Sequence, residues 1–105
     1  MSHGMVKVLR HIVLFSYNDG VTIEQKQEIR ERFAGLQAAT HLVAQFESGQ
    51  NNSPENLHHG FEDCFLVTFL TEKDRDAYLP HPGHQEFVSF LGPYVKEALV
   101  FDYWT

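Results

Sequence analysis

The sequence predicts an α+β fold of the ferredoxin-like type, with a four-stranded antiparallel sheet and two helical segments on one face. The main observation is the order of strand-like and helix-like patterns, strand-helix-strand-strand-helix-strand, which is the split βαβ arrangement. The length of 105 residues suits a single domain. Aromatic residues make up 13% of the chain, with nine phenylalanines, so rings must supply much of the buried surface.

Four segments have the composition of strands. Apolar, β-branched and aromatic residues predict strands over residues 6–15, 41–47, 61–70 and 95–104. The clearest is 61–70, whose apolar residues fall on both faces and indicate a strand that is covered on both sides. Between the second and third strands, residues 48–60 are rich in Gly, Asn, Ser and Pro and predict a loop. Loops beyond about a dozen residues are often functional lids, so this one is a candidate lid over a cavity.

Two helical segments complete the pattern. Residues 22–38 predict an amphipathic helix, because Thr22 can begin a capping box and apolar side chains recur at helical spacing. The second segment begins after Thr71, which can cap it and is followed by acidic residues. Pro80 and Pro82 interrupt this segment, since proline lacks an amide donor and restricts the residue before it. Pro82 suits the first turn of a new helix, which then runs up to the next Gly-Pro pair.

This arrangement leaves one face of the sheet without helices. For a small chain with many aromatic strand residues, packing that face against a partner sheet is the cheapest way to bury it. We therefore expect a homodimer in which the two sheets face each other. A cavity is expected on the helix side of each subunit, between the sheet and the second helix.

The net charge limits which kinds of binding partner are expected, and the cysteine content limits which disulfides can form. The formal net charge is −6 and the eight Lys and Arg residues are scattered, which argues against a nucleic-acid or anionic-membrane surface. The single cysteine, Cys64, excludes an internal disulfide and is expected to be a small buried hydrophobe. With no signal-peptide pattern and no membrane-spanning apolar stretch, a cytoplasmic location is expected. Residues 1–5 are interpreted as a tag or disordered extension and residues 6–105 as the domain.

The stretch from Asp76 to Phe87, DAYLPHPGHQEF, combines two prolines, a glycine and two histidines. His81 and His84 stand three residues apart around the second proline. A rigid corner at the start of a helix projects side chains from a fixed backbone, so the corner could aim ionisable groups at a ligand. Alternatively, the histidines only cap and fill a tight corner. Both interpretations stay open at this point.

Four short stretches together resemble a known family. They are RHIVLF at 10–15, GQNNSPE at 49–55, YLPHPGHQEF at 78–87 and VFDY at 100–103. They resemble the stress-responsive A/B barrel domain family, a group of dimeric α/β barrels, and the resemblance runs over about residues 8–103. It implies a ferredoxin-like monomer and a dimer that forms a barrel.

The histidine-containing element is also similar to that of a plant polyketide cyclase within this family. That enzyme closes a linear polyketide by aldol condensation and needs no metal. By this resemblance, His84 corresponds to the catalytic base and Tyr78 to its partner. Supporting residues correspond to His11, His81 and Asp102. The resemblance therefore implies a site without cofactor or metal.

These residue types fit such chemistry, and each also has a plainer interpretation. A neutral imidazole can take a proton from carbon beside a carbonyl, and a carboxylate such as Asp102 can fix its tautomer. Tyr78 can donate a hydrogen bond to a developing enolate oxygen. In the plainer interpretation, His81 is an N-cap, His11 a buried hydrogen-bonded histidine, Tyr78 a core ring and Asp102 a strand-end partner. Zinc at His81 and His84 is disfavoured, because the sequence has neither a cysteine cluster nor a His-Glu-x-x-His pattern.

Three functions remain as hypotheses. The first is a non-enzymatic dimer that binds a small hydrophobic or aromatic ligand. The second is a cofactor-free lyase that abstracts a proton or catalyses an aldol-type cyclisation, with His84 as base and Tyr78 as acid or oxyanion donor. The third is a monooxygenase of the dimeric α/β barrel type, for which no motif is evident. A cavity beside His84, closed by the long loop, would favour the second over the first.

Overall fold

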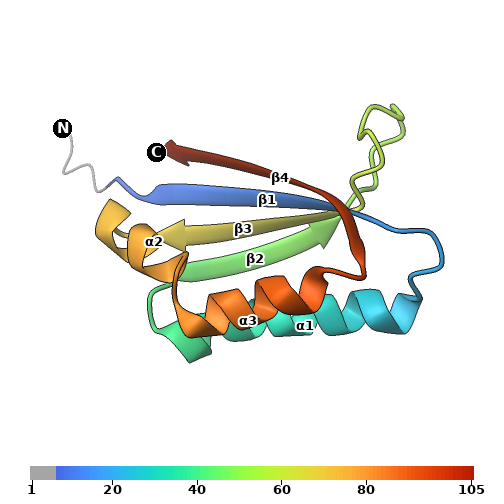
Figure 1. The fold of residues 1–105 in the computed structure, drawn as a ribbon. Coiled ribbons are helices and arrows are strands. Elements are labelled where there is room, and N and C mark those ends of the chain that lie inside the picture. The colour runs from blue at the N-terminus through green and yellow to red at the C-terminus, as the bar shows by residue number, and fades with distance from the viewer. Residues whose placement is uncertain (1–6) are drawn as a thin grey trace.

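The computed structural model describes residues 7–105, which form one sheet and three helices (Figure 1). The interpretation of residues 1–5 lies outside the described residues. The elements in chain order are β1 (Leu9–Tyr17), α1 (Ile23–Thr40), β2 (Gln45–Gln50), β3 (Asp63–Phe69), α2 (Glu72–Tyr78), α3 (Pro82–Leu91) and β4 (Val95–Trp104).

The sheet is antiparallel throughout and has the strand order β2-β3-β1-β4. The central strand β1 pairs with β3 on one side and with β4 on the other. Helices α1 and α3 lie side by side across one face of the sheet, and α2 lies at one end of it (Figure 1). The predicted ferredoxin-like α+β fold is confirmed.

The first three strands have other bounds than predicted, and two of these differences have identifiable reasons. The second strand was expected over residues 41–47, but β2 begins at Gln45. Helix α1 runs further than expected, and His41 ends it as a C-cap in the left-handed region, with φ of 58°. At the first strand, β1 continues past the expected end to Tyr17, because β4 pairs with it along that whole length.

The second helical segment is divided as the prolines predicted. Thr71 caps α2 by accepting a hydrogen bond from the backbone N–H of Asp74 at 3.0 Å. Helix α3 starts at Pro82, and His81 is its N-cap. The Nδ1 atom of His81 accepts the backbone N–H of Gly83 at 3.0 Å. The plainer interpretation of His81 is therefore confirmed.

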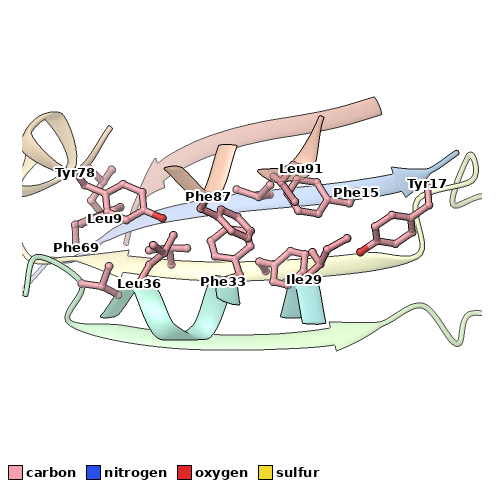
Figure 2. Close-up of a cluster of buried hydrophobic side chains, with 14 residues drawn as sticks. Leu9, Phe15, Tyr17, Ile29, Phe33, Leu36, Phe69, Tyr78, Phe87 and Leu91 are labelled. Atoms are coloured by element: carbon pink, nitrogen blue, oxygen red, sulfur yellow. The ribbon is translucent and has the colours of Figure 1, made fainter. Parts of the chain in front are cut away.

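The core lies between the helices and the sheet and is built largely from rings (Figure 2). Phe33 of α1 stacks on Phe65 of β3, with ring centroids 4.4 Å apart. Phe87 of α3 also packs against Phe33, with its centroid 4.8 Å from that of Phe33. Phe33 therefore links α3 to β3 through α1, and truncating a buried ring of this kind costs about 3–5 kcal/mol.

The face of the sheet without helices is apolar over its centre, and we call it the open face. Alternation along the strands directs these side chains away from the helices. The apolar members are Ile12, Leu14, Cys64, Leu66, Leu99 and Phe101. Phe101 is 60% exposed. Cys64, expected as a small buried hydrophobe, lies on the open face and is half-buried in the single chain.

Candidate functional site

A cavity of about 520 Å³ lies on the helix side of the sheet, between β1 and β4 and the helices α2 and α3. Its position matches the cavity predicted between the sheet and the second helix. Ionisable groups gather toward one end: His11, Arg75, Asp76, His84 and Asp102. The remaining walls are apolar and include Val13, Phe15, Phe33, Phe87, Leu91 and Val100.

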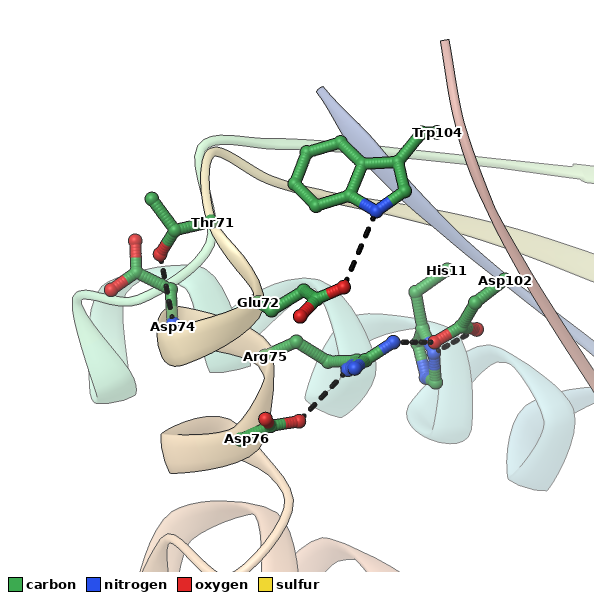
Figure 3. A network of polar contacts seen from close by, with 8 residues as sticks. All are labelled: His11, Thr71, Glu72, Asp74, Arg75, Asp76, Asp102 and Trp104. Carbon is green, nitrogen blue, oxygen red and sulfur yellow. Dashed lines mark hydrogen bonds and ion pairs between the residues drawn. The ribbon is translucent and has the colours of Figure 1, made fainter. Parts of the chain in front are cut away.

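At the polar end, β1, β4 and α2 are joined by one carboxylate (Figure 3). Asp102 lies directly across from His11 in the strand register, and its Oδ1 atom is 2.7 Å from Nδ1 of the imidazole. The other oxygen accepts a hydrogen bond from Arg75 Nη1 at 3.1 Å. A carboxylate only accepts, so Nδ1 of His11 must carry the proton. When His11 is neutral, its Nε2 lone pair is therefore the free side of the ring.

His84 in the first turn of α3 is held in the same tautomer by the backbone. Its Nδ1 atom is 2.8 Å from the carbonyl oxygen of Leu79, which can only accept. Burial lowers the pKa of His84, the hydrogen bond to Leu79 opposes this effect, and the nearby His11 and His81 lower the pKa further. His84 is thus a neutral imidazole near pH 7, with Nε2 available as an acceptor or base.

Tyr78 at the end of α2 supports these two rings from behind. It is fully buried, and its ring centroid lies 4.6 Å from that of His84 and 6.3 Å from that of His11. Its hydroxyl points into the buried cluster (Figure 2) and has no hydrogen-bond partner among residues 7–105. Burial raises the pKa of Tyr78 far above its ordinary value, so the hydroxyl keeps its proton.

The structure therefore brings together some of the predicted residues and separates others. His11, His84 and Asp102 line one cavity, and Tyr78 lies against two of them without lining it. His81 is outside the cavity lining and caps α3.

Arg75 is the residue that sequence reasoning missed. It lies within the charged run Glu72–Asp76, which has the composition of a solvated helix surface. The available signal was its spacing, because Arg75 stands three residues before Tyr78 and so shares its helix face. The contact with Asp102 depends on β4, which is 27 residues away in the chain, and no local pattern indicates it.

The long loop does not line this cavity, so the closure that would have favoured an enzyme is not found here. Residues 51–62 join β2 and β3 at the end of the sheet near Phe15, whereas His11 and Asp102 lie toward the other end (Figure 1). Part of the loop, including Leu57 and Phe61, instead lines a second cavity of about 550 Å³ on the open face.

A separate buried cluster fixes the other end of the sheet. The hydroxyl of Tyr17 donates to the buried carboxylate of Asp63, and Arg30 of α1 donates to the same carboxylate at 3.1 Å. Burial and then the hydrogen bond to Asp63 raise the pKa of Tyr17. Tyr17, Arg30 and Asp63 use these groups to hydrogen-bond to one another. The cluster therefore anchors α1 to β3 and offers no group for binding a ligand.

Two negative findings apply to residues 7–105. No helix there is long and apolar enough to cross a membrane. No group of three or more His, Cys, Asp or Glu side chains in this part of the chain is arranged to hold a metal ion.

The fold and the cavity together define a class: a ferredoxin-like α+β domain with a mostly apolar cavity between sheet and helices, polar at one end. Comparison with known proteins then identifies the family. Residues 9–105 match the family described as Stress responsive A/B Barrel Domain, and the chain belongs to it.

Two curated relatives span nearly the whole chain. The stress-response A/B barrel domain-containing protein HS1 of Arabidopsis thaliana is 35% identical over 96 residues, covering 90% of this chain and 87% of the relative. Olivetolic acid cyclase of Cannabis sativa is 23% identical over 95 residues, covering 90% of this chain and 94% of the relative. The resemblance inferred from the sequence is thereby confirmed.

Solved structures support the fold. The hydroxynitrile lyase from Passiflora edulis superposes with a TM-score of 0.88 at 22% identity, covering 96% of this chain and 95% of the lyase. A ferredoxin-like protein from Jannaschia sp. CCS1, described as dimeric, has a TM-score of 0.78 at 25% identity and covers 91% of this chain and 97% of its own.

Proposed function

We propose that this protein is a homodimer that binds a small apolar ligand in the cavity between the sheet and α3. The observation that carries the proposal is the distribution of polarity in the cavity, where apolar walls meet a cluster of ionisable groups at one end. A volume of about 520 Å³ falls in the range of roughly 300–1,000 Å³ that is usual for small-molecule sites.

The strands set the length of the ligand. His11 and Phe15 both line the cavity and are four residues apart on β1, which corresponds to roughly 13 Å at a rise of about 3.3 Å per residue. The polar end lies at His11 and the apolar end at Phe15. A ligand that fits has one polar head and an apolar ring or short chain behind it.

Binding can be tested with 4-butylphenol and a pair of tryptophan variants on α3. Val88→Trp places a large ring at a residue that lines the cavity and is 46% exposed, so the fold has room to accept it. Ser89→Trp places the same ring at the next residue, which is exposed and outside the lining. Calorimetry should show binding to the wild type and Ser89→Trp, and at least about tenfold weaker binding to Val88→Trp. Equal affinity in all three proteins would exclude this cavity.

A cofactor-free lyase or cyclase is the second candidate function. The observation that favours it is the tautomer of His84, whose Nε2 is left without a partner while Nδ1 donates to Leu79. A neutral imidazole in this state can abstract a proton beside a carbonyl, and Tyr78, packed against it at a tilted angle, holds the ring in place. The monooxygenase alternative has gained no support from these contacts and stays an untested prediction.

This chemistry can be measured without knowing the natural substrate. In D₂O, the wild type should exchange the α-protons of 4-butylacetophenone faster than buffer does, as followed by proton NMR. His84→Gln should lose that acceleration, and His59→Gln, in the loop that lines the other cavity, should keep it. Exchange at the buffer rate in the wild type would reject the enzymatic candidate and leave the binding proposal intact.

Assembly through the open face is the remaining part of the proposal. Its apolar centre includes Leu99 and Phe101, which are 41% and 60% exposed in the single chain. A second copy with the same face would cover both patches at once, as a two-fold interface requires. At micromolar concentration, sedimentation should give a dimer for the wild type and a monomer for Phe101→Lys. Ile23→Lys, on α1 away from that face, is the control and should remain dimeric.

A further inference from the structure

The polar end of the cavity contains a cation whose charge is already compensated. Nε of Arg75 donates to Asp76 at 3.0 Å, and Nη1 donates to Asp102 at 3.1 Å (Figure 3). All three residues line the cavity. Arg75 therefore meets a ligand as the centre of an ion cluster and not as a free positive charge.

The polar end of the cavity has no net positive charge. One guanidinium and two carboxylates leave a formal charge of −1 with both imidazoles neutral, and zero if His11 is protonated. In neither state does positive charge remain for an anionic head group. A ligand carboxylate entering this end would lose its hydration without gaining an uncompensated cation, which is costly.

Hydrogen-bond geometry leads to the same conclusion. A guanidinium offers a carboxylate two edges, each with a pair of parallel N–H groups. On Arg75, Nε already donates to Asp76 and Nη1 to Asp102, so each of the two edges contains a nitrogen that is already engaged. Neither edge is left whole for a two-point contact with a third carboxylate, so a ligand can only reach the remaining N–H groups singly.

The two imidazoles add acceptors where an anion would need donors. His11 and His84 each direct Nδ1–H toward a framework oxygen, so the neutral rings offer only Nε2 lone pairs to the cavity. Lone pairs repel carboxylate oxygens, but they accept hydrogen bonds from a hydroxyl or an amide N–H. An uncharged head group can donate to these lone pairs: a phenol O–H to one ring, and the two N–H groups of a primary amide to one ring or both.

We infer that the cavity selects an uncharged, hydrogen-bond-donating head group, such as a phenol or a primary amide, and discriminates against carboxylates. This inference rests on the proposed ligand-binding function and adds the chemical class of the ligand. Arg75, clamped between Asp76 and Asp102, is the specificity-determining feature.

The test compares 4-butylbenzamide with 4-butylbenzoate, two probes that differ in head-group charge and have the same apolar part. Calorimetry at pH 7.5 in 150 mM salt should show that the wild type binds the amide at least about tenfold more tightly than the carboxylate. Asp76→Asn releases one edge of Arg75 and should strengthen carboxylate binding severalfold, so that the ratio of amide to carboxylate affinity falls.

A matched variant separates the local cluster from the overall charge of −6. Asp74→Asn makes the same charge change on the same helix but outside the cavity lining, and it should not alter the amide-to-carboxylate ratio. Equal affinity for both probes in the wild type, or equal effects of the two variants, overturns the inference and leaves ligand binding standing. Failure of both probes to bind overturns the proposed function and the inference with it.

Discussion

Replacing Tyr78 with phenylalanine should make the protein more stable, which is unusual for a fully buried side chain. The Tyr78 hydroxyl is buried and has no partner among the described residues, so folding removes it from water without compensation. A buried polar group left unsatisfied costs about 1–3 kcal/mol. Phenylalanine keeps the ring contacts with His84 and Phe69 and removes only the oxygen.

The magnitude of the effect on melting follows from the chain length. We expect the free energy of unfolding to rise by about 1 kcal/mol, the lower end of that range, because the deleted oxygen leaves a small void. For 105 residues, an unfolding entropy of about 2.1 cal/mol/K per residue converts this to a Tm increase of about 4–5 °C.

The same substitution at the other end of the sheet supplies a control of opposite sign. The Tyr17 hydroxyl donates to the buried carboxylate of Asp63, so Tyr17→Phe removes a partner from a buried charge. This change should lower stability by about 1.5–3 kcal/mol. Urea unfolding by circular dichroism measures both variants, at one fixed protein concentration because assembly contributes to stability.

The signs of the two effects decide whether the reasoning holds. If Tyr78→Phe destabilises the protein as much as Tyr17→Phe does, the Tyr78 hydroxyl has a partner and its role as an unsatisfied group is refuted. Because Tyr78 is fully buried and outside the cavity lining, Tyr78→Phe should leave 4-butylphenol binding unchanged.

Two further predictions concern the groups around His84. Because burial lowers the native pKa of His84, the unfolded chain takes up its proton first, near the ordinary pKa of 6.5. The contribution of His84 to stability is therefore complete above about pH 6.5 and is lost as the pH falls through the lower native pKa. His84→Gln should flatten that part of the profile of urea midpoint against pH, and an unchanged slope would contradict the assignment. Arg75→Gln should release Asp102, and nitrogen NMR should then detect a mixture of His11 tautomers in place of Nδ1–H alone. Arg75→Lys should restore the wild-type spectrum in part, since it keeps the charge without the guanidinium fork.

Most of the fold was predictable because its determinants are local. Thr22 and Thr71 cap helices through side chains that contact their own first turn, and Pro82 starts a helix by virtue of its fixed φ. The error at the second strand arose where a local pattern was ambiguous. His41 adopts a left-handed conformation to end α1, and nothing in its neighbours distinguishes this from the start of a strand.

The site was predictable only as far as the family resemblance reached. It indicated His11, His84 and Asp102, which line the cavity, but also His81, whose ring nitrogen is used for capping. Arg75 was missed because its role depends on a tertiary contact with β4. Loop length marked residues 48–60 as a candidate lid, but it does not indicate which face of the sheet a loop will cover.

The proposed ligand site and the proposed assembly surface meet on a single strand. Along β4, Val100 and Asp102 line the cavity, while Leu99 and Phe101 alternate with them on the open face. In the described sheet, β4 is an edge strand whose ladder hydrogen bonds are made with β1 alone. A second copy packed on Phe101 would restrain the strand from the other side and hold Asp102 in register with His11. Disrupting assembly should therefore loosen the polar end of the cavity, although the cavity lies on the side of the sheet opposite the open face. The affinity for a ligand then gives a second measurement of the same interface.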